Sequence, residues 1–90
     1  MLDNFIDFLS AQKRFSEHTA VAYRKDLKQF LEFAEISKEE ELKEVSPRLI
    51  RGWMVDLMEN DYVSQSVNRK LSTLRTYFKW LKKESVITEN

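Results

Sequence analysis

The sequence predicts an all-α fold in which four helices form one small domain. Ninety residues, 42% of them hydrophobic and 33% charged, are typical of a globular chain that buries a single core. The chain has only one glycine and one proline. Because β-rich folds need turn residues at many positions, this scarcity favours a few long helices. Apolar residues also recur at helical spacing in four separate stretches.

The first helix is expected at about residues 2–13. Its apolar positions fall on one face and its acidic residues, Asp3 and Asp7, fall on the other. Lys13 and Arg14 suit the C-terminal end of a helix, where cations interact favourably with the helix dipole. The apolar positions are Leu2, Phe5, Ile6 and Leu9.

The second helix is expected at residues 17–35. Ser16 is the expected N-cap, with Glu17 in the first turn and Thr19 where the acid of a capping box often stands. The apolar stripe occupies a narrow arc at about 100° per residue. It consists of Ala20, Tyr23, Leu27, Phe30, Leu31 and Ala34.

An acidic connection separates the two halves of the chain. Residues 35–44 hold five Glu and two Lys, a net charge of −3, and are expected to form an exposed acidic connection that can include a helical turn. Ser46 and Pro47 then predict the start of a third helix at residues 47–60, as an N-cap followed by proline at the first helical position. Its inner face is Leu49, Ile50, Trp53, Met54 and Leu57.

The fourth helix is expected at residues 65–83, with Ser64 as its cap. Its stripe has the alternating spacing of four and three that indicates a helix, and consists of Val67, Leu71, Leu74, Phe78 and Leu81. Lys70 and Tyr77 are expected toward the edge of that buried stripe. After the helix, the tail from Val86 to Asn90 is expected to leave the helical path.

Several function classes are disfavoured by what the sequence lacks. His18 is the only histidine, there is no cysteine, and one glycine cannot form a phosphate-binding loop. No metal, no cofactor and no catalytic residue is therefore expected, and His18 is expected to be an exposed or half-buried side chain near a helix cap. The N-terminus lacks the pattern of a signal peptide and no stretch is long enough to cross a membrane, so a cytoplasmic protein without membrane partners is expected.

The strongest positive signal is the basic stretch at residues 64–83, which carries six Lys or Arg and no acid in a chain of formal net charge zero. At 100° per residue its polar side chains fall on one exposed strip. Amide and guanidinium groups of this kind reach phosphates and base edges of DNA. The strip contains Gln65, Asn68, Arg69, Ser72, Arg75 and Lys79, and the second helix offers Arg24, Lys25 and Lys28 with Thr19 and Tyr23 nearby. Acids cluster at 32–44 and 56–61 and bases at 13–28 and 69–83, and such a dipolar chain can be steered toward DNA.

Two alternatives remain open at this point. The cations can simply solubilise two amphipathic helices, since a charge run is usually a solvated face. The domain can also be a helical protein–protein interaction module without DNA binding, whose aromatic residues contact another chain. Salt dependence separates phosphate binding from apolar docking, because only the former weakens steeply as salt is added.

The string SEHTAVAYRKDLKQFLEF resembles the opening of the core-binding domain of tyrosine recombinases, the family of phage integrases. In that family a Ser-x-x-Thr start precedes Tyr-x-x-Asp-Leu and an aromatic pair. The matching residues here are Ser16, Thr19, Tyr23, Asp26, Leu27, Phe30 and Phe33. The stretches 46–61 and 64–90 are similar to the family's third and fourth helices and the start of its interdomain linker, so the resemblance covers nearly the whole chain.

The resemblance implies a four-helix SAM-like bundle over residues 1–90 that clamps duplex DNA at a recombination site. In the family the second and fourth helices face the DNA. Carried over, the resemblance implies DNA contacts from Thr19, Tyr23, Arg24, Lys28, Gln65, Ser66, Asn68, Arg69, Ser72, Arg75 and Lys79. It also implies that the catalytic domain is absent from these ninety residues, so that the chain is a non-catalytic part of a recombinase. The isolated domain is then expected to be monomeric, and the parent protein to act as a tetramer of recombinase protomers on double-stranded DNA.

Overall fold

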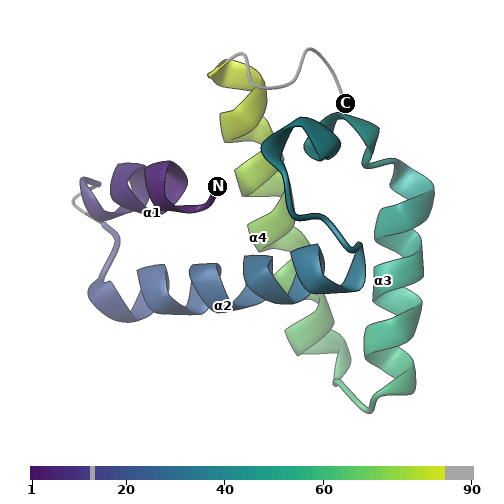
Figure 1. Ribbon diagram of the computed structural model, residues 1–90. Helices are drawn as coiled ribbons and strands as arrows, with labels where there is room; N and C mark the ends of the chain where they lie inside the picture. The colour runs from purple at the N-terminus through teal and green to yellow at the C-terminus, as the bar shows by residue number, and fades with distance from the viewer. Residues whose placement is uncertain (13, 85–90) are drawn as a thin grey trace.

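The computed structural model describes residues 1–12 and 14–84, and over these residues it confirms the predicted all-α fold. The elements in chain order are α1 (Asp3–Ser10), α2 (Glu17–Phe33), a short 3₁₀ helix η1 (Glu39–Glu44), α3 (Pro47–Glu59) and α4 (Ser64–Lys83). Helix α2 crosses α4, while α1 lies along α2 and α3 lies beside α4 (Figure 1). The predicted path of residues 86–90 and the position of Lys13 lie outside the described residues.

Local capping explains where the central helices begin. The Ser16 hydroxyl accepts a hydrogen bond from the backbone N–H of Thr19 (3.1 Å), and the Ser46 hydroxyl accepts one from that of Leu49 (3.2 Å). Both predicted N-caps are therefore confirmed, and each satisfies a backbone donor that the first turn of a helix leaves free.

Helices α2 and α3 end in the same way, although no glycine is present at either end. Glu35 and Asp61 adopt positive φ angles of 57° and 66°. Beyond them, the N–H of Ile36 bonds to the carbonyl of Leu31 and that of Tyr62 to Leu57. These are Schellman motifs, and they stop α2 two residues before the predicted end at residue 35.

Helix α1 is shorter than predicted. It ends at Ser10 instead of near Lys13, because the Gln12 N–H turns back to the carbonyl of Leu9 and the chain reverses. That reversal brings Phe15 edge-on against Tyr23 of α2, with 5.6 Å between ring centroids.

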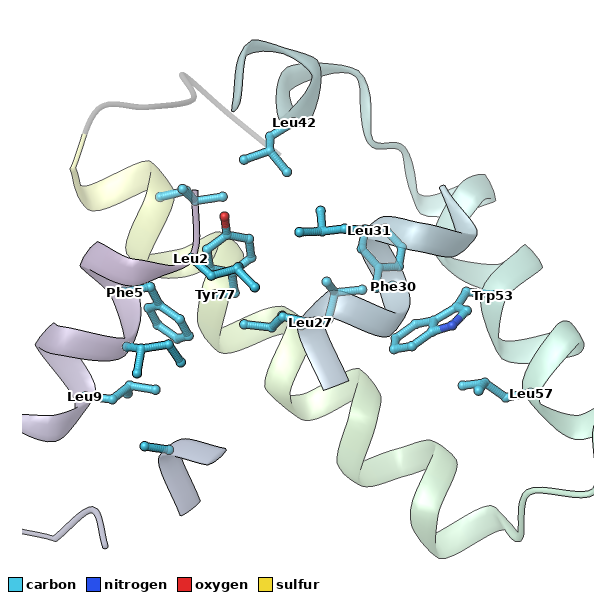
Figure 2. Packing of buried hydrophobic residues seen from close by; sticks show 14 of the residues in the cluster. Leu2, Phe5, Leu9, Leu27, Phe30, Leu31, Leu42, Trp53, Leu57 and Tyr77 are labelled. Carbon is cyan, nitrogen blue, oxygen red and sulfur yellow. The ribbon is translucent and has the colours of Figure 1, made fainter. Parts of the chain in front are cut away.

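The core is continuous from α1 to α3 (Figure 2). Phe5 of α1 lies next to Tyr77 with Leu9 beyond it, Leu27 follows on the other side of Tyr77, and Trp53 and Leu57 lie at the far end of the core. The ring centroids of Phe5 and Tyr77 are 5.0 Å apart, and those of Phe30 and Trp53 are 5.1 Å apart. In the predicted acidic connection, Leu42 of η1 is fully buried and the half-buried Glu41 accepts hydrogen bonds from the backbone N–H groups of Ser37 and Lys38. The connection is therefore a structural element and not only an exposed linker.

Candidate nucleic-acid interface

A buried carboxylate joins the two helices that carry the candidate residues. Asp26 of α2 is 2% exposed, and its Oδ1 accepts hydrogen bonds from Lys70 Nζ (2.8 Å) and Arg69 Nη2 (3.0 Å) of α4. Thr73 Oγ1 lies 3.5 Å from the other carboxylate oxygen. Because an unpaired buried charge is costly, this pairing fixes how α2 crosses α4.

Lys70 extends the same network to the loop between α3 and α4. Its Nζ also donates to Gln29 Oε1 (2.7 Å) and lies 5.2 Å from the centre of the Tyr62 ring, while Gln29 Nε2 donates to the Tyr62 hydroxyl (3.0 Å). The expectation that Lys70 and Tyr77 lie at the edge of the buried face is therefore wrong: both are buried. At about 100° per residue, Lys70 stands at the middle of the buried arc of α4 and Val67 about 60° to one side. The reason is that α1 and α2 both cover the Lys70 and Tyr77 side of the helix.

The exposed strip of α4 exists as the sequence indicates. Gln65, Asn68, Ser72, Arg75 and Lys79 are all exposed and follow one another at intervals of three or four residues. Such spacing places them along one line on the helix surface. Ser66 is only half-buried and stands to the side of that line.

Arg69 connects the strip to α2. Its side chain is 58% exposed although its Nη2 holds the Asp26 carboxylate. A guanidinium has five N–H donors in a fixed planar fork, so several remain for another acceptor. The buried carboxylate thus orients an arginine whose outer edge faces solvent.

The start of α4 differs from the prediction. The helix begins at Ser64 with Val63 at the N-cap position, and the structure shows no side-chain hydrogen bond capping it. Ser64 therefore does not act as the predicted cap. Its place in the first turn follows from the extended backbone of Val63, whose carbonyl accepts the first helical bond, from Val67.

The candidate residues of α2 lie apart from the α4 strip. Arg24 Nη2 donates to Asp3 Oδ1 of α1 (2.9 Å), and Lys28 lines a shallow hollow with Met1, Leu2 and Asp3. The contact with Arg24 also holds the pKa of the Asp3 carboxyl below its usual range, first through the hydrogen bond and then through the charge. Arg24 and Lys28 thus stand on the flank of α2 that faces α1.

Thr19 and Tyr23 have local structural roles. The Thr19 hydroxyl lies 3.1 Å from that of Ser16 within the N-cap, and the Tyr23 ring packs between Phe5 and Phe15 at 6.4 and 5.6 Å. Both side chains are half-buried. The Tyr-x-x-Asp-Leu pattern is therefore accounted for by packing and by the ion pair to α4.

Lys25 is absent from the DNA contacts that the resemblance implies, although it belongs to the basic group on the second helix. It is exposed and precedes Gln29 by one helical turn, on the flank of α2 where Gln29 reaches Lys70 and Tyr62. Lys25 consequently lies toward Arg69 and the α4 strip. A signal was present in the sequence, since Lys25 is one residue before the aspartate that pairs with α4, but the partner of that aspartate is visible only in the fold.

Two structural features are absent from the part of the chain that the structure describes: clusters of metal-ligating side chains and helices able to span a membrane. Among residues 1–12 and 14–84, no three His, Asp or Glu side chains gather as they do around a metal ion. Over the same residues, no helix has the length and apolar character needed to cross a lipid bilayer. His18 is exposed in the first turn of α2, as expected.

Comparison with known proteins agrees with this architecture. The family model described as "Phage integrase, N-terminal SAM-like domain" matches residues 2–85. Tyrosine recombinase XerC of Anoxybacillus flavithermus is 35% identical over 89 residues, which are 99% of this chain and 30% of that protein. Tyrosine recombinase XerC of Thermodesulfovibrio yellowstonii is 37% identical over 89 residues, 99% of this chain and 28% of that protein.

The chain therefore spans less than a third of the length of the curated relatives it matches. No solved structure matches it at a significant level. The family match covers all four α-helices and confirms the resemblance seen in the sequence. This chain belongs to the phage integrase N-terminal SAM-like domain family.

Proposed function

We propose that this domain binds duplex DNA as the non-catalytic, core-binding part of a site-specific tyrosine recombinase. The observation that carries the proposal is the exposed strip of α4, with Arg69 held beside it by the buried Asp26. Amide, hydroxyl and cationic groups in one line on a helix suit insertion into a major groove. The relatives named tyrosine recombinase support the role in recombination, and strand exchange would require residues outside these ninety.

Within this proposal the residues have different tasks. Arg69, Arg75 and Lys79 contact phosphates and set the position of α4, while Gln65, Asn68 and Ser72 reach base edges. Lys25 of α2 makes a further contact with a phosphate. The resemblance also assigns DNA contacts to Thr19, Tyr23, Arg24, Lys28 and Ser66, and these stay predictions. Four of them are half-buried, and Lys28 is exposed but lies on the flank of α2 that faces α1.

The first experiment measures binding of a fluorescent random-sequence duplex of about 16 base pairs at several salt concentrations. The logarithm of the association constant should fall linearly with the logarithm of the salt concentration. The double variant Arg75→Gln/Lys79→Gln should flatten that slope by about 1.8, or about 0.9 for each lost phosphate contact. The matched control is Lys38→Gln/Arg48→Gln, which removes two exposed cations away from the strip. Equal slopes in the two variants would contradict the proposed role of α4.

A second comparison decides which flank of α2 faces DNA. Lys25→Gln and Lys28→Gln each remove one exposed lysine from the same helix. The geometry predicts that only Lys25→Gln flattens the salt slope, by about 0.9. The reverse result would favour the assignment that the resemblance makes for Lys28. The rival hypothesis of a protein-interaction module without DNA binding predicts no salt-dependent binding of the duplex by any of these proteins.

A further inference from the structure

A groove of about 780 Å³ opens between η1, α3 and the C-terminal half of α4, away from the crossing of α2. Its floor is apolar, because α3 and α4 each carry a second row of apolar residues beside the row that is buried in the core. The floor is formed chiefly by the half-buried side chains Val45, Ile50, Met54, Leu71 and Phe78.

The rim of this groove carries charge of one sign only. Lys43 of η1 and Arg51 of α3 stand on one side, and Arg75, Lys79 and Lys82 of α4 stand on the other. Among the described residues that line the groove there is no Asp or Glu, although the chain as a whole has fifteen acids and fifteen bases. An apolar trough between two basic edges is thus concentrated on one face.

The dimensions fit a helix. From Leu71 to Lys82 the groove follows α4 over 12 residues, and the 11 steps of 1.5 Å between them give about 16 Å, or about three helical turns. An amphipathic helix laid in such a groove inserts apolar side chains at positions i, i+4 and i+7. Carboxylates on both sides of that apolar face would meet the basic edges.

We propose that this groove docks an acidic amphipathic helix of a partner protein. Duplex DNA fits less well, since phosphates would gain nothing from the apolar floor. A small polar ligand fits less well too, because Ser46 is the sole uncharged polar side chain among the described lining residues and its hydroxyl already caps α3.

A second copy of this chain is a poorer occupant. On its α3, the exposed apolar residues Val55 and Met58 stand beside acids but span a single helical turn, whereas the groove accepts about three turns. The acidic outer face of α1 offers Phe8 as its one exposed large apolar side chain, and its Asp3 is already paired with Arg24. The acidic η1 buries its leucine in its own core. The inference is independent of DNA binding, although Arg75 and Lys79 belong to both surfaces.

The test uses a fluorescent synthetic helix of about 15 residues with leucines at i, i+4 and i+7 and glutamates on both flanks. Binding is measured by anisotropy and mapped on the ¹⁵N-labelled domain by NMR. The expected result is saturable binding with shifts at η1, α3 and the second half of α4. Arg51→Glu/Lys82→Glu should weaken it about tenfold, since two exposed ion pairs become repulsive.

The matched control is Arg48→Glu/Lys83→Glu, which reverses one exposed cation on each of the same helices outside the groove. It should change the affinity less than twofold. A peptide with lysines in place of the glutamates should bind at least tenfold more weakly. The proposal is overturned if the lysine peptide binds as tightly as the glutamate peptide, or if the glutamate peptide produces no shifts at the groove. It is equally overturned if Arg48→Glu/Lys83→Glu weakens binding as much as Arg51→Glu/Lys82→Glu. It is also overturned if sedimentation shows that the domain dimerises through the groove, or if duplex DNA instead of the peptide shifts the Ile50 and Met54 signals.

Discussion

Replacing Lys70 with methionine should show how much the buried ion pair contributes to stability. Methionine keeps the length of the apolar stem but removes the Nζ that bonds to Asp26 and Gln29 at 2.8 and 2.7 Å. Removing one partner of a buried pair typically costs about 3–5 kcal/mol. Because Arg69 still holds the same carboxylate at 3.0 Å, we expect the lower end, about 3 kcal/mol.

That loss is large for a domain of this size. At about 0.05–0.15 kcal/mol per residue, the free energy of unfolding is on the order of 5–13 kcal/mol. A loss of about 3 kcal/mol should lower Tm by roughly 12–24 °C, using about 4–8 °C per kcal/mol. The assay is urea unfolding followed by far-ultraviolet circular dichroism, with Lys83→Met as an exposed control on the same helix.

A double variant distinguishes electrostatics from packing. Asp26→Asn leaves an uncharged side chain whose single oxygen can still accept from Arg69 and whose NH2 group can donate to the Thr73 hydroxyl. Adding it to Lys70→Met therefore removes a buried carboxylate that has lost one of its two cationic partners. Asp26→Asn/Lys70→Met should therefore be more stable than Lys70→Met alone. If Lys70→Met lies within about 0.5 kcal/mol of the control, or if Asp26→Asn lowers stability further in the Lys70→Met background, the pair does not stabilise the crossing as argued.

Two further predictions concern single side chains. Tyr77→Phe should leave the free energy of unfolding at neutral pH unchanged or raise it by about 1 kcal/mol, since the buried Tyr77 hydroxyl has no hydrogen-bond partner among the described residues. Burial, and then the charge of Glu39, raise the pKa of Tyr77 well above its usual value of about 10. The free energy of unfolding of the wild type should therefore fall as pH rises above about 10, whereas that of Tyr77→Phe should lack this loss. Urea titrations at alkaline pH would reveal or contradict the difference. Glu35→Gly should raise the free energy of unfolding by about 1 kcal/mol, because glycine adopts the positive φ of 57° without strain. Glu32→Gly, inside the same helix, should lower it by a similar amount, and a loss in both variants in urea unfolding would refute the strain argument.

What the sequence predicted well is local. The apolar stripes, the N-caps Ser16 and Ser46, and proline at the start of α3 each depend on residues within a few positions of one another. These features located the helices with boundary errors of at most three residues, and the starts of α2 and α3 and the end of α4 agree with the prediction. The ends of α2 and α3 were less accessible, because Glu35 and Asp61 fill positions that glycine usually marks.

What the sequence could not provide is the angle between helices. The buried arc of α4 is set by contacts with α1, α2 and α3 together, and a helical wheel centred on Val67 therefore placed Lys70 at the edge when it lies at the middle. The same crossing separates Arg24 and Lys28 from the α4 strip. Leu42 was hidden in an acidic run, because a single buried leucine gives no periodic signal.

The buried network also decides which residue gives an unambiguous test of the candidate interface. Arg69 is the most suggestive of the exposed cations, yet its guanidinium satisfies the Asp26 carboxylate at 3.0 Å. A change of Arg69 to glutamate would place a second carboxylate beside the buried carboxylate of Asp26 and weaken the packing of α2 against α4. A lower affinity of this variant for DNA could then come from the altered fold as well as from a lost contact. Arg75 stands two turns of helix further along, is exposed, and makes no hydrogen bond or ion pair among the described residues that shapes the fold. Loss of DNA binding in an Arg75 variant that unfolds like the wild type would therefore assign contact with DNA to the surface of α4.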